Sequence, residues 1–106
     1  MRIKYKNITS DGTITLLAKG GEKGTYGQLV SFIQISNHDD SSRNIVNLFL
    51  HGGGGIPDYV VLETVIPARS TLVLRDAEVK YDGKVYDLKI TTDDDGGTTN
   101  MTVIIK

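Results

Sequence analysis

The sequence predicts an all-β fold: a single antiparallel β-sandwich of eight or nine short strands, without a substantial helix. Three observations lead to this prediction. Apolar and polar residues alternate along several short stretches, which is the periodicity of half-buried strands. Glycine, proline, asparagine and aspartate gather between these stretches as turn signals. The chain has 106 residues, so residues 1–106 suit one domain with one hydrophobic core.

The first two strands are predicted at residues 2–8 and 13–18, on either side of a Ser-Asp-Gly turn. In the first strand, basic residues alternate with apolar ones, which gives it two faces of opposite character. In the second strand, the alternation places Leu16 on one face and Leu17 on the other.

A longer strand is predicted at residues 28–37, after a loop at residues 20–27. That loop holds four glycines, which make a strand or helix interior costly there. Ile33 and Ile35 share one face of the strand and belong to the predicted core. After a polar turn, residues 44–50 alternate again and place three apolar side chains on one face.

The next strand pair is the centre of the prediction and reads YVVLETVIPARSTLVLRD. Residues 59–66 and 71–74 are rich in β-branched side chains and flank Pro-Ala-Arg-Ser, so we expect strand, turn and strand. The first strand is apolar on both faces, with Val61 and Val65 expected to point away from Val60. Either both faces are buried within one subunit, or a neighbour docks on the second face.

The last part of the chain predicts a hairpin and a final strand. Residues 79–81 and 84–90 flank Asp-Gly, which favours a type I′ turn because both central residues of such a turn have positive φ. Residues 91–99 are rich in Asp, Gly and Thr and are predicted as a loop, and residues 100–106 as a strand. Strands of this length separated by turns favour a sandwich, with jelly-roll connections among the topologies that fit.

Composition disfavours several classes of function. The chain has no cysteine, so it forms no disulfide and offers no thiolate nucleophile or thiolate metal ligand. Twelve basic and thirteen acidic residues give a net charge of -1, which does not favour a nucleic-acid or membrane partner. No apolar run resembles a signal peptide or is long enough to span a bilayer. We therefore expect a soluble protein of a reducing compartment or of a particle assembled inside a cell.

No residue pattern predicts catalysis, a cofactor or a metal site. The glycine-rich loops lack the helix and the Gly-Lys order of phosphate-binding loops, and are predicted to become ordered against a neighbour. Neither His38 nor His51 has a serine and a carboxylate placed beside it in the sequence. The acidic clusters at residues 39–40 and 93–95 lack the ligand spacing of a calcium loop and are predicted as solvated turns. We expect no enzymatic activity.

The candidate contact residues are apolar side chains that alternation leaves outside the core, together with two aromatic residues in or beside glycine-rich loops. They are Ile45, Phe49, Val61, Val65, Tyr26 and Tyr59. The two tyrosines are also the candidate sugar-binding platforms. A basic stripe at Arg2, Lys4 and Lys6 is interpreted as a charge-protected edge strand or as a complement to acidic turns of a second copy, rather than as a phosphate contact.

Several segments resemble small virion proteins of tailed bacteriophages, in particular uncharacterised structural proteins of marine cyanophages. These segments are FIQISNHD at 32–39, RNIVNLFL at 43–50, an Ile-Pro-x-x-x-Thr-Leu-x-Leu pattern at 66–74, a Tyr-x-Leu-x-Ile strand at 86–90 and a terminal strand at 101–105. The resemblance covers roughly residues 28–106.

The resemblance implies a non-enzymatic β-sandwich component of a virion that is assembled in the host cytoplasm. Its partners would be other virion proteins, either capsid or tail subunits, and further copies of itself. Decoration or cementing of the capsid is the favoured role. The alternatives are a tail, neck or fibre component and a host-surface carbohydrate-binding module, while a small hydrolase or nuclease has the least support. No cofactor, nucleic acid or membrane partner is expected.

Overall fold

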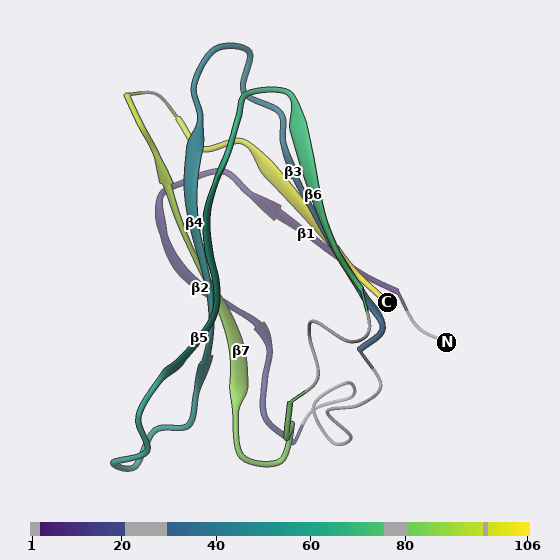
Figure 1. Ribbon diagram of the computed structural model, residues 1–106, viewed down its shortest axis with the longest axis vertical. Helices are drawn as coiled ribbons and strands as arrows, with labels where there is room; N and C mark the ends of the chain where they lie inside the picture. The colour runs from purple at the N-terminus through teal and green to yellow at the C-terminus, as the bar shows by residue number, and fades with distance from the viewer. Residues whose placement is uncertain (1–2, 21–29, 76–80, 97) are drawn as a thin grey trace.

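The computed structural model describes residues 3–20, 30–75, 81–96 and 98–106, and within them the chain forms eight strands and no helix. The strands are β1 (Lys4–Ile8), β2 (Gly12–Leu17), β3 (Phe32–Asn37), β4 (Asn44–His51), β5 (Tyr59–Ile66), β6 (Ser70–Arg75), β7 (Asp87–Asp94) and β8 (Met101–Ile105). They form two antiparallel sheets, with the order β1-β8-β3-β6 in the first sheet and β2-β7-β4-β5 in the second (Figure 1). The predicted all-β sandwich is confirmed.

Successive strands lie in different sheets, except β4 and β5, which pair as a hairpin within the second sheet. Eight strands in two four-stranded sheets of this order form a jelly roll. In Figure 1 the two sheets lie as two layers, and the start of β1 lies beside the end of β8 in the first sheet. The edge strands are β1 and β6 in the first sheet and β2 and β5 in the second.

The predicted central pair, β5 and β6, is divided between the two sheets. The chain leaves β5 at Pro67, turns at Ala68 and Arg69, and enters β6 at Ser70. Arg69 has a φ of 58°, in the left-handed region that suits such a sharp change of direction. β5 therefore pairs with β4, and β6 pairs with β3, rather than with each other.

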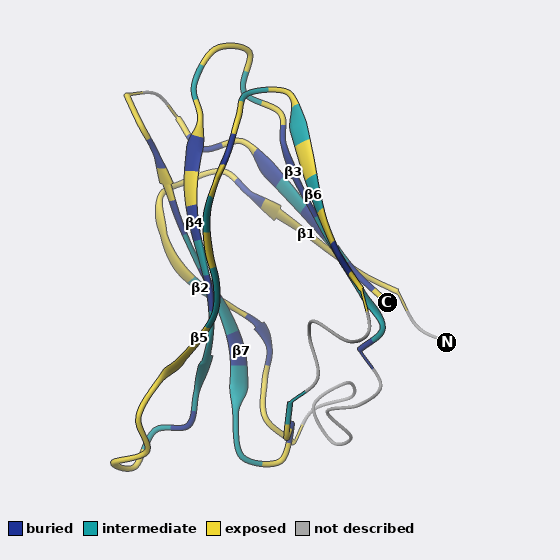
Figure 2. Ribbon diagram, in the orientation of Figure 1, coloured by how far each residue is buried: buried dark blue, intermediate teal, exposed yellow. Residues whose placement is uncertain are grey.

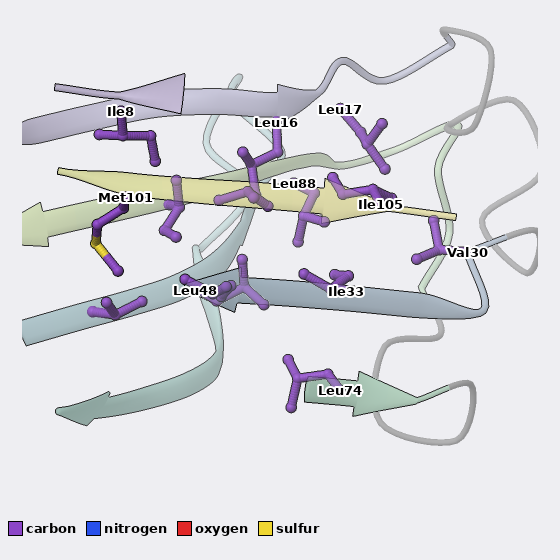
Figure 3. Packing of buried hydrophobic residues seen from close by; sticks show 14 of the residues in the cluster. Ile8, Leu16, Leu17, Val30, Ile33, Leu48, Leu74, Leu88, Met101 and Ile105 are labelled. Carbon is purple, nitrogen blue, oxygen red and sulfur yellow. The ribbon is translucent and has the colours of Figure 1, made fainter. Parts of the chain in front are cut away.

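The core lies between the sheets and is made of apolar side chains from both of them. Figure 2 shows buried residues on strands of both layers, and Figure 3 shows the side chains packed in the space between them. Its members are Ile8, Leu16, Leu17, Val30, Ile33, Ile35, Val46, Leu48, Ile66, Leu74, Leu88, Ile90, Met101, Val103 and Ile105. The alternating residues predicted for β3 and β8 are among them, as are Val46 and Leu48 of β4, while Leu50 is partly buried against this core.

A bulge in β2 changes one predicted face. The register with β7 shifts between Thr15 and Leu17, so one extra residue is inserted on β2. Because the shift interrupts the alternation, both Leu16 and Leu17 are buried, where the sequence pattern placed them on opposite faces.

The predicted type I′ hairpin is absent from the described residues, and residues 79–80 lie outside them. The amides of Val85 and Tyr86 both donate to the carbonyl oxygen of Asp82, and the Lys84 amide donates to the Asp82 carboxylate. These bonds wind the chain into a longer turn, so β7 begins only at Asp87.

The far end of β7 also differs from the prediction. β7 runs on through Asp94, inside the stretch predicted as a loop, because its last residues pair with β4 from Asn44 to Asn47. A pairing partner distant in the sequence thus extends a strand that local turn signals would end.

Candidate functional site

The outer face of β4 and β5 gathers three of the six predicted contact residues: Ile45, Phe49 and Val65. Three cross-strand pairs point outward: Ile45 with Val65, Asn47 with Glu63, and Phe49 with Val60. Paired residues on adjacent strands project to the same side of a sheet, and the intervening Val46 and Leu48 are buried in the core. We call this surface the β4–β5 face, made up of Ile45, Asn47, Phe49, Val60, Glu63 and Val65.

Apolar side chains dominate the β4–β5 face. The exposed fractions are 38% for Ile45, 44% for Val65 and 59% for Val60, and Phe49 is half-buried. The polar pair Asn47 and Glu63 separates the two apolar pairs. Exposed apolar side chains that pair across two strands and alternate with polar groups are typical of a protein contact surface.

The β4–β5 face is bordered differently on its two sides. On one side lies β7, whose outward residues Asp93, Thr91 and Lys89 are in register with β4. On the other side β5 is the last strand of the sheet, so no described strand covers its outer edge. A partner could therefore contact the face and the strand edge together.

The structure corrects the predicted orientation of Val61. The register between β4 and β5 shifts at Leu48 and Phe49, which leaves Val61 as an extra residue between Leu62 and Val60. Val61 then packs against the core, and Val60 takes the outward position. Val60, which strict alternation placed on the inner side, thus belongs to the contact face. No local sequence signal marks the bulge that brings it there.

Tyr59 is the first residue of β5 and lies next to the β4–β5 face. Its side chain is 51% exposed, and its ring meets the Tyr86 ring edge-to-face with centroids 5.8 Å apart. The other predicted aromatic residue, Tyr26, lies outside the described residues.

The glycine-rich turn between β4 and β5 has side-chain anchors on both sides. His51 Nδ1 lies 2.7 Å from Asp58 Oδ1, a carboxylate that sequence reasoning did not associate with it. Lys19 Nζ donates to the carbonyl oxygen of Gly52 at 2.8 Å, which ties the turn to the segment after β2. The turn closes with an isolated bridge between Gly53 and Ile56.

The opposite end of the sandwich holds an acidic set of loops joined by polar contacts. The Asp11 carboxylate accepts hydrogen bonds from the Thr99 hydroxyl and the Asp94 amide, and these bonds lower the pKa of Asp11. The amides of Ser41 and Ser42 donate to Asp39 and lower its pKa as well. Hydrogen bonds to the charged form of a carboxylate favour that form.

Within the described part of the chain, no group of three or more His, Cys, Asp or Glu side chains is placed to hold a metal ion. The same residues contain no helix long and apolar enough to cross a membrane. The acidic loops are instead anchored by hydrogen bonds and by two exposed ion pairs, Arg43 with Asp95 and Arg69 with Asp40.

Comparison with known proteins identifies the fold alone. No protein-family model matches the chain, and no curated protein matches it. The crystal structure of PirA aligns with 94% of this chain and 90% of its own, at a TM-score of 0.57 and 12% identity. The crystal structure of the Yersinia pseudotuberculosis-derived mitogen aligns with 99% of this chain and 85% of its own, at a TM-score of 0.54 and 14% identity.

The Anabaena sensory rhodopsin transducer is a third similar structure, with a TM-score of 0.50 and 14% identity over 89% of this chain and 79% of its own. Structures of infectious bursal disease virus also align, but at TM-scores of 0.38 or lower. The three structures with TM-scores of 0.50 or higher agree with the β-sandwich architecture described above.

Proposed function

We propose that this chain is a non-enzymatic structural subunit of a bacteriophage virion that acts through protein contacts, most plainly as a decoration or cement protein of the capsid. The observation that carries the proposal is the β4–β5 face. Ile45, Val65 and Val60 stay exposed and Phe49 half-buried on the outer side of a sheet whose inner side already supplies the core. The resemblance of residues 28–106 to small virion proteins supports other virion proteins as the partners of this surface.

The architecture suits such a role for a physical reason. A sandwich with a complete core can present one outer face to a partner without losing its own stability. Burying Val60 and Val65 against a partner removes apolar area from water, which contributes about 25 cal/mol per Å² before the costs of association are subtracted. The polar pair Asn47 and Glu63 would fix the register of docking, because an unpaired buried polar group is costly.

The test is incorporation into particles. Quantitative mass spectrometry of purified virions from the source culture should detect the chain, and its copy number should scale with the capsid rather than with the tail. The purified chain should also sediment with particles that lack it. A copy number typical of a tail, neck or fibre would move the role to that part of the particle, and absence from virions would refute a virion role.

The β4–β5 face supplies the matched variants. Val60→Lys/Val65→Lys places two charges in the proposed contact and should abolish sedimentation with particles. Thr13→Lys/Thr15→Lys adds the same charge to exposed outward positions of β2, on the same sheet but away from the face, and should leave binding intact. Equal loss in both variants would mean that binding does not depend on the β4–β5 face.

A carbohydrate-binding role is the second candidate, favoured by one observation. The exposed Tyr59 ring is held edge-to-face on Tyr86, a rigid aromatic surface on which a sugar ring can pack. This role predicts glycan-array binding that Tyr59→Ala removes and Tyr5→Ala, a change at another exposed tyrosine, preserves. An array without hits would eliminate it.

A further inference from the structure

A groove opens along one side of the sandwich, between the edge strands β1 and β2. It encloses about 260 Å³ and is lined by Lys4, Tyr5, Lys6, Thr15, Leu16, Val103 and Ile105. Its floor is apolar, because Leu16, Val103 and Ile105 are core residues supplied by both sheets. Figure 3 shows Leu16 and Ile105 in the packed space between the sheets.

The two lysines of β1 stand on the inner side of their strand. Lys4 is in register with Ile105, Lys6 with Val103, and Ile8 with Met101. The three β8 partners, Ile105, Val103 and Met101, are buried on the core side of their strand. Side chains in register share a face, so both lysines project over the groove rather than away from the sandwich. The ion pairs formed among the described residues lie elsewhere, at Arg43, His51 and Arg69.

No described strand pairs with β1 on the side away from β8. β1 is the terminal strand of the first sheet, in agreement with one of the two interpretations of its basic stripe, and it pairs only with β8 among the described strands. An edge strand presents unpaired amide and carbonyl groups, which can pair with an added strand.

From these observations we infer that β1 accepts an extended acidic segment of a partner protein as an added strand. Carboxylate side chains at alternate positions of that segment would lie opposite Lys4 and Lys6, on the groove side. The positions between them would lie beside the outward Tyr5, which is 69% exposed, and would be apolar or β-branched. The recognised chemistry is thus an alternation of Asp or Glu with apolar residues.

The lysines also select against other occupants. If β1 paired edge to edge with β1 of a second copy, lysines of both copies would be brought together, which is unfavourable. Neutral and basic strands gain nothing from Lys4 and Lys6, whereas an acidic strand is attracted by both. This contact is independent of the proposed function, whose site is on the other sheet, so either proposal can fail without the other.

The probe is a capped hexapeptide that alternates Glu and Val, carrying a fluorescent label. Fluorescence anisotropy should show saturable binding to the wild-type chain that weakens as salt is raised. A block peptide of three Glu followed by three Val has the same charge and composition, and an alternating Lys and Val peptide has the opposite charge. Both should bind at least about tenfold more weakly, because neither pairs carboxylates with alternate lysines.

Variants of the chain locate the site. Lys4→Glu/Lys6→Glu should weaken binding of the alternating acidic peptide by about tenfold or more, and Lys4→Gln/Lys6→Gln should weaken its binding less. Lys84→Glu/Lys89→Glu makes the same change of charge on a turn and on the outward side of β7, and should leave affinity unchanged. Amide hydrogen exchange should slow within β1 when the peptide is bound.

Two results would overturn the inference. Equal binding of the alternating and block peptides would show a charge effect without strand addition. If the alternating peptide does not bind to the folded wild-type chain, the role of the lysines is to protect the strand edge. In that case Lys4→Val/Lys6→Val should promote aggregation.

Discussion

At the scale of single residues, the clearest constraint lies at Gly52, at the start of the turn between β4 and β5. A Cβ atom built there would lie 2.8 Å from Ile56 Cγ2 and 2.9 Å from Ile56 Cβ. Gly54, two residues on, has open space around it but a φ of +56°. One glycine is therefore required by close packing, and the other by backbone conformation.

Gly52→Ala should lower the free energy of unfolding by about 1–3 kcal/mol, because Ile56 and the turn must move to admit the methyl group. Gly54→Ala should cost about 1 kcal/mol through its left-handed backbone alone. Urea unfolding of both variants, each alone and combined with Ile56→Gly, and of Ile56→Gly itself checks this. Relative to Ile56→Gly alone, Gly52→Ala should then cost less than it does in the wild-type chain, while the cost of Gly54→Ala should be unchanged. Without that coupling, the contact with Ile56 does not explain the cost.

Tyr81 is a second residue with a measurable signature. Burial, with a smaller contribution from the negative charge of Asp87, raises the pKa of Tyr81 to about 12. Its hydroxyl is buried and has no hydrogen-bond partner among the described residues. In the unfolded chain the phenol ionises near pH 10, so the folded state holds the proton more tightly, and stability should fall as pH rises from about 10 to about 12.

Tyr81→Phe should therefore flatten the alkaline decline in unfolding free energy and raise stability at neutral pH by about 1 kcal/mol. Urea unfolding at pH values from about 8 to about 12 measures both effects, with Tyr5→Phe, at an exposed ring, as the control. An unchanged alkaline slope in Tyr81→Phe would mean that another group causes the decline.

At the scale of elements, strict alternation succeeded on β3, β4 and β8, which carry no inserted residue. β3 and β8 bury the predicted side chains, and β4 buries Val46 and Leu48 with Leu50 packed against the core, because a period of two determines which residues face the core. It failed at Leu17 and Val61, where bulges insert one residue and reverse the faces that follow. A bulge depends on the partner strand, so the local sequence could not reveal it.

The same limit explains the errors at both ends of β7. Asp-Gly at residues 82–83 signals a hairpin, yet the turn is set by hydrogen bonds to Asp82. The polar residues 91–94 signal a loop, yet pairing with β4 makes them a strand. Of the predicted contact residues, Ile45, Phe49 and Val65 lie together on the β4–β5 face, while Val60 replaces Val61 there.

The bulge in β5 makes a prediction from two adjacent valines. Val60→Lys should change the free energy of unfolding by less than about 0.5 kcal/mol, because the side chain already faces solvent. Val61→Lys should lower it by roughly 1–3 kcal/mol, because Val61 packs against the core and an ammonium group there would be poorly solvated. Thermal or urea unfolding gives both values. The reverse order would restore the simple alternation and remove Val60 from the contact face.

At the scale of the whole molecule, the two ends of the sandwich differ in how their loops are held. At the end that carries Asp11 and Asp39, the Asp11 carboxylate joins the turn after β1 to the end of β7 and the segment that follows it, and the Asp39 carboxylate binds two amides of its own turn after β3. Buried Asn44 adds to this set, since its side chain donates to the Thr99 hydroxyl and accepts from the Asp93 amide. Charge on Asp11 and Asp39 thus bears on loops from both sheets.

This arrangement predicts a loss of stability in acid. The hydrogen bond from Thr99, followed by that from the Asp94 amide, lowers the pKa of Asp11 from 3.8, and the amides of Ser41 and Ser42 lower that of Asp39. The unfolded chain then binds protons more readily than the folded one, so the stabilisation is full above about pH 4 and is lost as pH falls through the folded-state pKa values.

Urea unfolding from pH of about 6 down to about 2 should show this decline, and Asp11→Asn/Asp39→Asn should flatten it. Glu63→Gln, which removes an exposed carboxylate on the β4–β5 face, should leave the slope in place. Equal flattening per carboxylate removed would mean that net charge, rather than the bonded loops, governs acid stability.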